Sequence, residues 1–231
     1  MTFSGSATVV VVHGAWADGS SWQAIIRPLE DRGLNVIAAP IPLTSLSDDA
    51  AALKRTIVRT KGPVIVAGHA YAGAVIATAD DARVKALIYV AALAPDEGET
   101  VAQVFYRDAS HPKAPQLAPD ADGFIWMPDE GFRNAFAQNA TDEQIALAKA
   151  VQRPISVKSI QEPAPAPVWK SKPSWFLIAE EDRMINPKTQ RFMAERMKAT
   201  VRSFAIDHTP LLTAPDKVVD IILEAARATL A

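Results

Sequence analysis

The chain has 231 residues, 49% of them hydrophobic and 22% charged, and a formal net charge of -2. This balance is typical of a globular domain and argues against nucleic acid or an anionic membrane surface as a partner. With no cysteine and four histidines scattered singly along the chain, the sequence offers no disulfide framework, no thiolate nucleophile and no metal-ligand cluster. We therefore expect a single α/β domain with no cofactor.

The start of the chain predicts no export signal. Its first apolar run, residues 7–12, is short and follows no Lys or Arg, whereas a signal peptide has a basic start and a longer apolar run. No segment reaches the ~18 apolar residues of a membrane span. We expect a cytoplasmic monomer or homodimer that acts on a small molecule and has no membrane partner.

The chain opens with a buried strand and an amphipathic helix. Residues 9–12 are four valines, and such an unbroken β-branched run is typical of a strand covered on both faces. Apolar residues then recur at helical spacing in residues 22–29. We expect Ser20 or Ser21 to cap this helix and Gly33 to follow its end as the C′ residue.

A second strand and a second helix follow. Residues 35–38 predict a strand that ends before the proline at position 40. Ser47 is the expected N-cap of a helix that continues through position 57. Asp48 and Asp49 would lie in its first turn, where the helix dipole favours acidic side chains.

The third strand, at residues 64–67, runs into the sequence Gly68-His69-Ala70-Tyr71-Ala72-Gly73 and then a small-residue helix. A strand, a sharp turn flanked by glycines and a helix form the context in which G-x-S-x-G presents a nucleophilic serine. Here the central residue is Ala70. The frame of a covalent hydrolase is therefore present, whereas the attacking hydroxyl is not.

The alternation of strands and helices stops after a fourth strand at residues 86–90. Residues 96–169 show no clear strand and contain short helical patterns between turns rich in proline and aspartate. We interpret this segment as a helical lid inserted into a core made of residues 1–95 and 170–231. The helices expected in the lid are residues 101–106, 131–138 and 142–151.

Two more strands, at residues 175–179 and 201–206, precede a final helix that begins near position 215. Strands that alternate with helices imply parallel pairing and right-handed crossovers. The chain as a whole therefore predicts an α/β fold with about six mostly parallel strands flanked by helices.

Three residues at the carboxyl ends of predicted strands form a candidate catalytic set. Ala70 follows the third strand, Asp182 the fifth and His208 the sixth, and the carboxyl ends of parallel strands meet at one edge of a sheet. Asp182 would accept a hydrogen bond from one imidazole nitrogen of His208 and leave the other as general base. Glu181 and Asp96 are the alternatives to Asp182.

The turn after the first strand supplies a candidate oxyanion hole. We nominate the backbone N–H groups of Ala15, in this turn, and of Tyr71, which follows the nucleophile position. Gly14 would permit close approach of the backbone to a ligand. We interpret His13 and His69 as structural.

Aromatic and apolar residues near this turn and in the lid predict an apolar substrate pocket for a hydrophobic acyl or aromatic group. Any one of them could instead pack the lid on the sheet. The candidates are Trp16, Phe105, Tyr106, Phe124, Trp126 and Met127.

These motifs span nearly the whole chain and resemble the α/β-hydrolase superfamily, in particular its compact branch of plant methylesterases, hydroxynitrile lyases and bacterial esterase-like hydrolases. The matching segments are residues 13–16, 68–73, 181–185 and 207–208. The resemblance implies an α/β-hydrolase fold and a Ser-His-Asp type site. The lyases carry threonine where Gly14 stands and lysine where Thr209 stands, so carboxylic ester or lactone hydrolysis is the better match.

The alanine at position 70 leaves three interpretations open. A methyl group cannot attack a carbonyl, so this chain should form no acyl-enzyme. It is an inactivating serine-to-alanine form of an esterase, or a native enzyme in which His208 and Asp182 act as general base without covalent catalysis. The third interpretation is a small-ligand-binding protein without catalytic activity.

Overall fold

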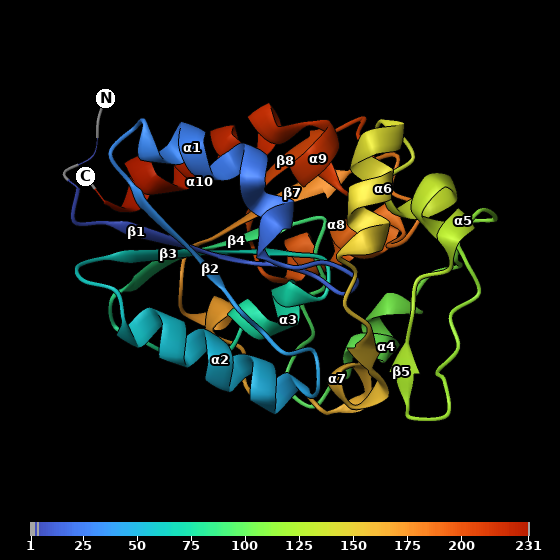
Figure 1. Cartoon of the computed structure of the whole chain (residues 1–231). Coiled ribbons are helices and arrows are strands. Elements are labelled where there is room, and N and C mark those ends of the chain that lie inside the picture. Colours follow the sequence, from blue (N-terminus) through green and yellow to red (C-terminus); the bar gives the residue numbers. More distant parts are fainter. Residues whose placement is uncertain (1–2, 4, 231) are drawn as a thin grey trace.

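The computed structural model describes residue 3 and residues 5–230, and a single six-stranded sheet forms its centre (Figure 1). The strands are β1 Thr8–Val12, β2 Asn35–Ala39, β3 Val64–His69, β4 Val84–Val90, β7 Ser174–Ala179 and β8 Thr200–Phe204. Their order in the sheet is β2-β1-β3-β4-β7-β8, and every neighbouring pair is parallel. The predicted α/β fold with six strands is confirmed.

Helices cover both faces of the sheet. The helices α1 Gln23–Glu30 and α10 Pro215–Thr229 pack on one face, and α2 Leu46–Val58, α3 Ala72–Ile76 and α8 Pro187–Arg196 pack on the other. In β1 the side chains of Val9 and Val11 pack on the face covered by α1 and α10, and those of Val10 and Val12 pack on the face covered by α2, α3 and α8. Successive strand residues point to opposite faces. A strand covered on both sides therefore needs apolar residues at every position, and the unbroken valine run supplies them.

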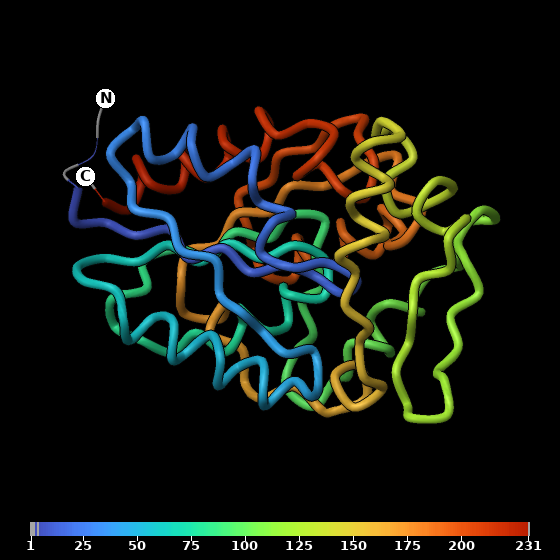
Figure 2. The backbone as a smooth tube through the Cα atoms, viewed as in Figure 1, coloured from blue at the N-terminus to red at the C-terminus, as the bar shows by residue number. Residues whose placement is uncertain are grey.

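Residues 96–169 gather at the end of the sheet where the strands terminate. Figure 2 shows the chain leave the sheet after β4, run through this end and return to β7. The elements here are α4 Val101–Phe105, β5 Phe124–Ile125, α5 Asp129–Gly131, a π-helical turn Phe132–Phe136, α6 Asp142–Ala150, β6 Ile155–Ser156 and α7 Val157–Gln161. The helices expected near 101–106 and 142–151 are present, and the one expected at 131–138 is split between α5 and the π-helical turn.

The expectation that this segment contains no strand is wrong. The strands β5 and β6 pair antiparallel, with Phe124 opposite Ser156 and Ile125 opposite Ile155. Two residues are too few to produce a recognisable alternation of apolar and polar side chains. Pairing with a distant partner, rather than local sequence, therefore makes these strands.

The predicted caps of the first two helices are also corrected. Asp18 accepts the N–H of Ser20 and caps a 3₁₀ turn, Gly19–Trp22, that precedes α1. Ser45 has extended backbone and its Oγ accepts the N–H of Asp48. Ser47 is not the cap, because it lies inside the first turn of α2. Its own N–H is one of the first-turn donors that have no acceptor within the helix.

A sharp turn at Ala70 links β3 to α3. Ala70 has a φ of 51°, which is a left-handed conformation that costs a residue with a Cβ about 1 kcal/mol. Its carbonyl oxygen accepts the N–H of Leu93 at 2.9 Å and that of Gly73 at 3.1 Å. A Cβ on Gly73 would overlap the carbonyl oxygen of Leu93, and one on Gly68 would lie 2.8 Å from the carbonyl oxygen of Ala72. The two glycines therefore let the turn pack directly against neighbouring backbone.

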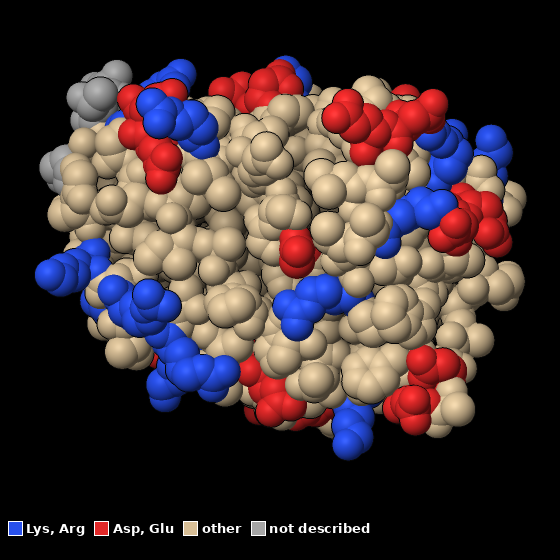
Figure 3. Space-filling view, viewed as in Figure 1, with Lys and Arg blue, Asp and Glu red and all other residues tan. Residues whose placement is uncertain are grey.

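Charged side chains of both signs are spread over the face of the molecule shown in Figure 3. On the face shown in Figure 3, blue and red groups are interspersed between broad uncharged areas, in keeping with a net charge of -2. Among the described residues, no helix combines the length and the apolar character that crossing a membrane requires.

The close packing of Gly73 generates a stability prediction. We expect Gly73→Ala to lower the free energy of unfolding by about 3 kcal/mol or more, because the added methyl collides with fixed backbone rather than with a flexible side chain. Gly5→Ala is the control, since a Cβ there meets nothing within 4 Å. Denaturant unfolding measures both. Equal stabilities for the two variants would contradict the packing described here.

Candidate active site

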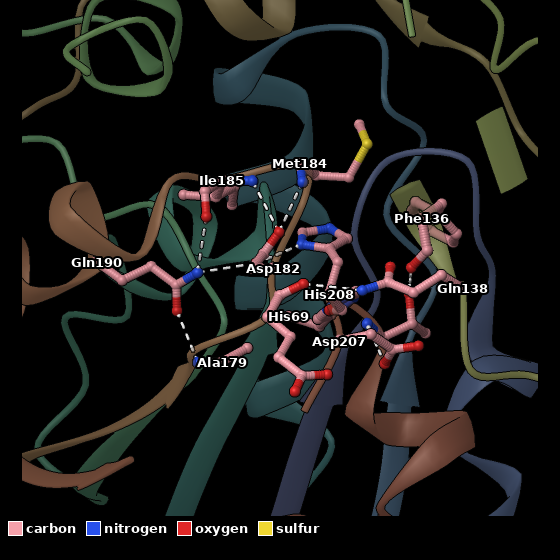
Figure 4. A network of polar contacts seen from close by, with 12 residues as sticks. His69, Phe136, Gln138, Ala179, Asp182, Met184, Ile185, Gln190, Asp207 and His208 are labelled. Carbon is pink, nitrogen blue, oxygen red and sulfur yellow. Dashed lines mark hydrogen bonds and ion pairs between the residues drawn. The ribbon is translucent and has the colours of Figure 1, made fainter. Parts of the chain in front are cut away.

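The three residues of the candidate catalytic set meet at the carboxyl ends of three strands. Ala70 follows β3, Asp182 lies shortly after β7 and His208 shortly after β8. All three side chains are almost completely buried. Figure 4 shows Asp182 and His208 facing one another within a network of polar contacts.

The His208 imidazole is held by a fully bonded carboxylate. Its Nδ1 lies 2.8 Å from Oδ2 of Asp182. The other oxygen of Asp182 accepts the N–H groups of Met184 and Ile185 at 2.7 and 2.8 Å, and Gln190 donates to Oδ2 at 2.8 Å. Four donors thus fix the carboxylate, and the carboxylate fixes the tautomer with the proton on Nδ1. Among the described residues no group bonds Nε2 of His208, which leaves it available as a base.

The alternative acids do not reach the imidazole. Glu181 points to solvent, and its backbone carbonyl accepts a bond from Gln138. Asp96 forms an ion pair with Lys170 at 2.5 Å. The geometry therefore pairs His208 with Asp182.

Two further histidines support the backbone around the site. Nε2 of His69 donates to the carbonyl oxygen of His208 at 2.7 Å. Burial, and then the neighbouring His208, lower the pKa of His69 to about 3, so its ring is neutral at physiological pH. Nδ1 of His13 donates to the carbonyl oxygen of Gly14 at 2.9 Å, and burial lowers its pKa as well. Both rings thus hold backbone carbonyl groups beside the site.

The loop that carries His208 is tied to segment 96–169. Asp207 is fully buried and accepts the N–H of Asn139 at 3.0 Å and the hydroxyl of Thr213 at 2.5 Å. The hydroxyl of Thr209 donates to the carbonyl oxygen of Phe136 at 2.5 Å. The sequence assigned Asp207 no role, because its partner Asn139 is distant in the chain.

The turn after β1 lies against the sharp turn of residues 68–73, which we call the elbow. A Cβ on Gly14 would lie 3.0 Å from the carbonyl oxygen of His69 and 3.1 Å from Cβ of Ala70, so the two loops pack closely at this glycine. Trp16 donates its backbone N–H to Arg153 at 3.0 Å and its indole N–H to Ile125 at 2.9 Å. Within the described part of the chain, the N–H groups of Ala15 and Tyr71 have no acceptor.

A cavity of about 60 Å³ opens between these groups and segment 96–169. Of the candidate pocket residues, Trp16, Phe105 and Tyr106 line it, and Phe136 meets Trp16 edge to face with ring centroids 6.2 Å apart. The remaining lining residues are Ala15, Ala70, Tyr71, Leu93, Val101, Ala102, Leu117, Ile125, Ile155, Ile160, Met184, Ile185 and His208. The cavity is small and almost wholly apolar apart from His208.

Three of the predicted pocket residues lie outside this lining. Ile125 lines the cavity and its neighbours Phe124 and Trp126 do not, as expected where successive residues of an extended segment point to opposite sides. Trp126 is 49% exposed and donates to Asp120. Met127 is buried, with its sulfur against Gly131. Phe136 lies in a stretch expected to be helical, but only its packing reveals its contact with the site.

Among residues 3 and 5–230, no group of three or more His, Asp or Glu side chains is arranged to hold a metal ion. The histidines near the cavity make single contacts with backbone or with one carboxylate. The site therefore combines the hydrogen-bonded side chains of His208 and Asp182, two N–H groups with no acceptor among the described residues, and apolar walls.

Comparison with known proteins identifies similar chains of nearly equal length. A family model described as the alpha/beta hydrolase family matches residues 9–221. Alpha/beta hydrolase nvfD of Aspergillus novofumigatus (strain IBT 16806) is 25% identical over 94% of this chain and 96% of its own length. Norfluorocurarine synthase 2 of Strychnos sp. is 24% identical over 93% of each chain. The crystal structure of polyneuridine aldehyde esterase has a TM-score of 0.82 and 16% identity, and covers 96% of this chain and 99% of that one.

The buried, neutral His69 predicts acid sensitivity. The folded protein binds a proton at His69 only near pH 3, whereas an unfolded histidine binds one near pH 6.5. The contribution of His69 to stability is therefore complete above pH 6.5 and is lost as the pH falls. Between about pH 7.5 and about pH 5 we expect a loss of about 2 kcal/mol. His69→Gln, which can still donate to the carbonyl of His208, should lack this part of the pH dependence in denaturant unfolding. The same slope in both proteins would contradict the assignment.

Proposed function

Because the chain belongs to the alpha/beta hydrolase family, we propose that its apolar cavity receives a small carboxylic ester or lactone, with His208 and Asp182 as the acid–base pair. The observation that carries this proposal is the 2.8 Å contact between these two side chains, at the wall of a cavity that Ala70 also lines. A positioned imidazole with one nitrogen held by a carboxylate is the arrangement that acyl transfer requires.

Each group at the cavity has a role in this reaction. With a serine at position 70, Nε2 of His208 would take the hydroxyl proton as the oxygen attacks the substrate carbonyl, and would then return it to the leaving alkoxide. The unpaired N–H groups of Ala15 and Tyr71 would bind the oxyanion that forms. Water would repeat the sequence to release the acid.

Of the groups that this proposed reaction needs, the nucleophile is the one that the residue at position 70 does not supply. Ala70 keeps the left-handed conformation of the elbow, with a φ of 51°, and its methyl group lies in the cavity lining. We therefore propose that this chain is an inactivated, serine-to-alanine form of an esterase-like site. An acyl-enzyme cannot form on a methyl group.

Segment 96–169 is the proposed lid, and the remaining residues, 1–95 and 170–231, are the proposed core. Many of the cavity-lining residues belong to the lid, among them Phe105, Phe136 and Tyr106. Tyr106 is 59% exposed and marks the mouth of the cavity. Walls of this kind favour an aliphatic or aromatic acyl group over a sugar or a phosphate.

A second candidate is non-covalent catalysis, in which His208 removes a proton from the carbon next to a carbonyl group or activates water. The unbonded Nε2 and the two unpaired N–H groups favour it, because they suit an enolate as well as a tetrahedral intermediate. A relative of similar length, norfluorocurarine synthase 2, is named as a synthase rather than as a hydrolase.

Restoring the hydroxyl tests the first proposal. We expect Ala70→Ser to raise kcat/KM on short aryl or methyl esters by at least ~10³, because the rest of the site is assembled. The double variant Ala70→Ser/His208→Ala should return to background. Steady-state kinetics with p-nitrophenyl acetate and methyl esters measure both. No gain from the serine would exclude the esterase scaffold and leave non-covalent catalysis or ligand binding.

The second candidate predicts activity in the present chain. Incubation in D₂O with small methyl ketones should give exchange of the α-protons, followed by NMR, because His208 would pass the proton to solvent through a bound enolate. His208→Ala should abolish the exchange. Exchange that persists in this variant, or that equals the buffer rate in both proteins, would exclude His208 as the base.

A further inference from the structure

Asp49 is a fully buried carboxylate next to the site, and the reaction proposed above does not use it. It lies in the first turn of α2, with none of its surface exposed. Its Oδ2 accepts the hydroxyl of Tyr71 at 2.6 Å, and its Oδ1 accepts the N–H of Leu43 at 2.7 Å. Attraction to the helix dipole, the role expected from the sequence, explains neither the burial nor these two partners.

The bond between Tyr71 and Asp49 has a defined direction. Burial raises the pKa of the Asp49 carboxyl to about 6, so the group is mostly ionised at neutral pH and accepts hydrogen bonds. Burial and the nearby carboxylate raise the pKa of the Tyr71 phenol well above its ordinary value. The phenol therefore keeps its proton and donates it to a charged acceptor, which makes a strong hydrogen bond.

The second partner of Asp49 connects the elbow to segment 96–169. Leu43 has a φ of 62°, a strained conformation for a bulky residue. Its N–H bonds Asp49, and its carbonyl oxygen accepts the N–H of Ser156 in β6 at 2.9 Å. The adjacent Ile155 lines the cavity. Asp49 thus joins Tyr71 on one side to the cavity wall on the other.

Tyr71 is the residue whose orientation this carboxylate controls. It precedes α3 and its side chain makes no capping bond. Its N–H has no acceptor among the described residues. The planar amide that carries this N–H is held on one side by the Ala70 carbonyl, which accepts from Leu93 and Gly73, and on the other side by the anchored ring of Tyr71. The ring itself lines the cavity.

We propose that Asp49 is a positioning residue for the oxyanion hole: by anchoring the Tyr71 hydroxyl, it fixes the Tyr71 N–H toward the substrate oxygen. This inference rests on the proposed function for the role of that N–H, and on the hydrogen bonds of Asp49 for the mechanism of positioning. The carboxylate itself touches neither substrate nor reacting atoms.

Kinetics in the Ala70→Ser background test the inference. We expect Asp49→Asn and Tyr71→Phe each to lower kcat about tenfold and to change KM less than about twofold, because a displaced N–H weakens transition-state binding more than substrate binding. The double variant should be no slower than either single one, since both remove the same contact. Asp48→Asn is the matched control, because Asp48 lies in the same turn with an exposed side chain and bonds only Thr44 and Ser45. Unchanged kcat in folded Asp49→Asn and Tyr71→Phe would overturn the inference.

A second measurement does not depend on catalysis. In the present chain, the NMR order parameter of the Tyr71 amide should be about 0.85, the value of rigid backbone, and should be lower in Asp49→Asn and Tyr71→Phe but not in Asp48→Asn. An unchanged order parameter in the first two variants would overturn the inference whatever the kinetics show. A lowered order parameter together with an inert Ala70→Ser form would support the positioning role of Asp49 and reject the proposed esterase function.

Discussion

The left-handed turn at Ala70 is the constraint around which the rest of the site is arranged. Its carbonyl oxygen is bound by Leu93, and the glycines at 68 and 73 allow neighbouring backbone to press against it. At Gly14 a second loop packs so closely on Ala70 that a Cβ added to this glycine would lie 3.1 Å from Cβ of Ala70. Because the chain is locked from several sides, the elbow keeps its shape with alanine at its centre. On the proposed function, a serine at this position would therefore change the chemistry and not the geometry of the turn.

The polar groups around this turn are arranged to avoid unpaired charge in an apolar setting. Asp182 receives four hydrogen bonds, and His69 remains neutral because burial disfavours its charged form. Buried charge is tolerated only where donors surround it. Among the described residues, Nε2 of His208 and the N–H groups of Ala15 and Tyr71 have no hydrogen-bond partner, and all three residues line the cavity.

Segment 96–169 is bound to the core at the site itself. Asp207 and Thr209, on either side of His208, bond backbone of residues 136–139, and Trp16 bonds Ile125 and Arg153. Asp49 reaches the same segment through Leu43 and Ser156. Segment 96–169 and the rest of the chain thus meet through hydrogen bonds that surround the cavity. A displacement of the segment would therefore move the groups that orient His208 and Tyr71.

The sequence by itself determined the order of the elements along the chain. It predicted the buried apolar strands, the glycine-flanked turn at Ala70, and the positions of Asp182 and His208 after later strands, because burial and turn chemistry set these patterns locally. It could not give β5 and β6, the direction in which Phe124 and Trp126 point, or the partners of Asp207 and Asp49. Each of those depends on contacts between residues far apart in the chain. Asp49 illustrates the difference: the sequence placed it in the first turn of a helix, and only tertiary packing buried that turn beneath Tyr71 and made the carboxylate part of the site's surroundings.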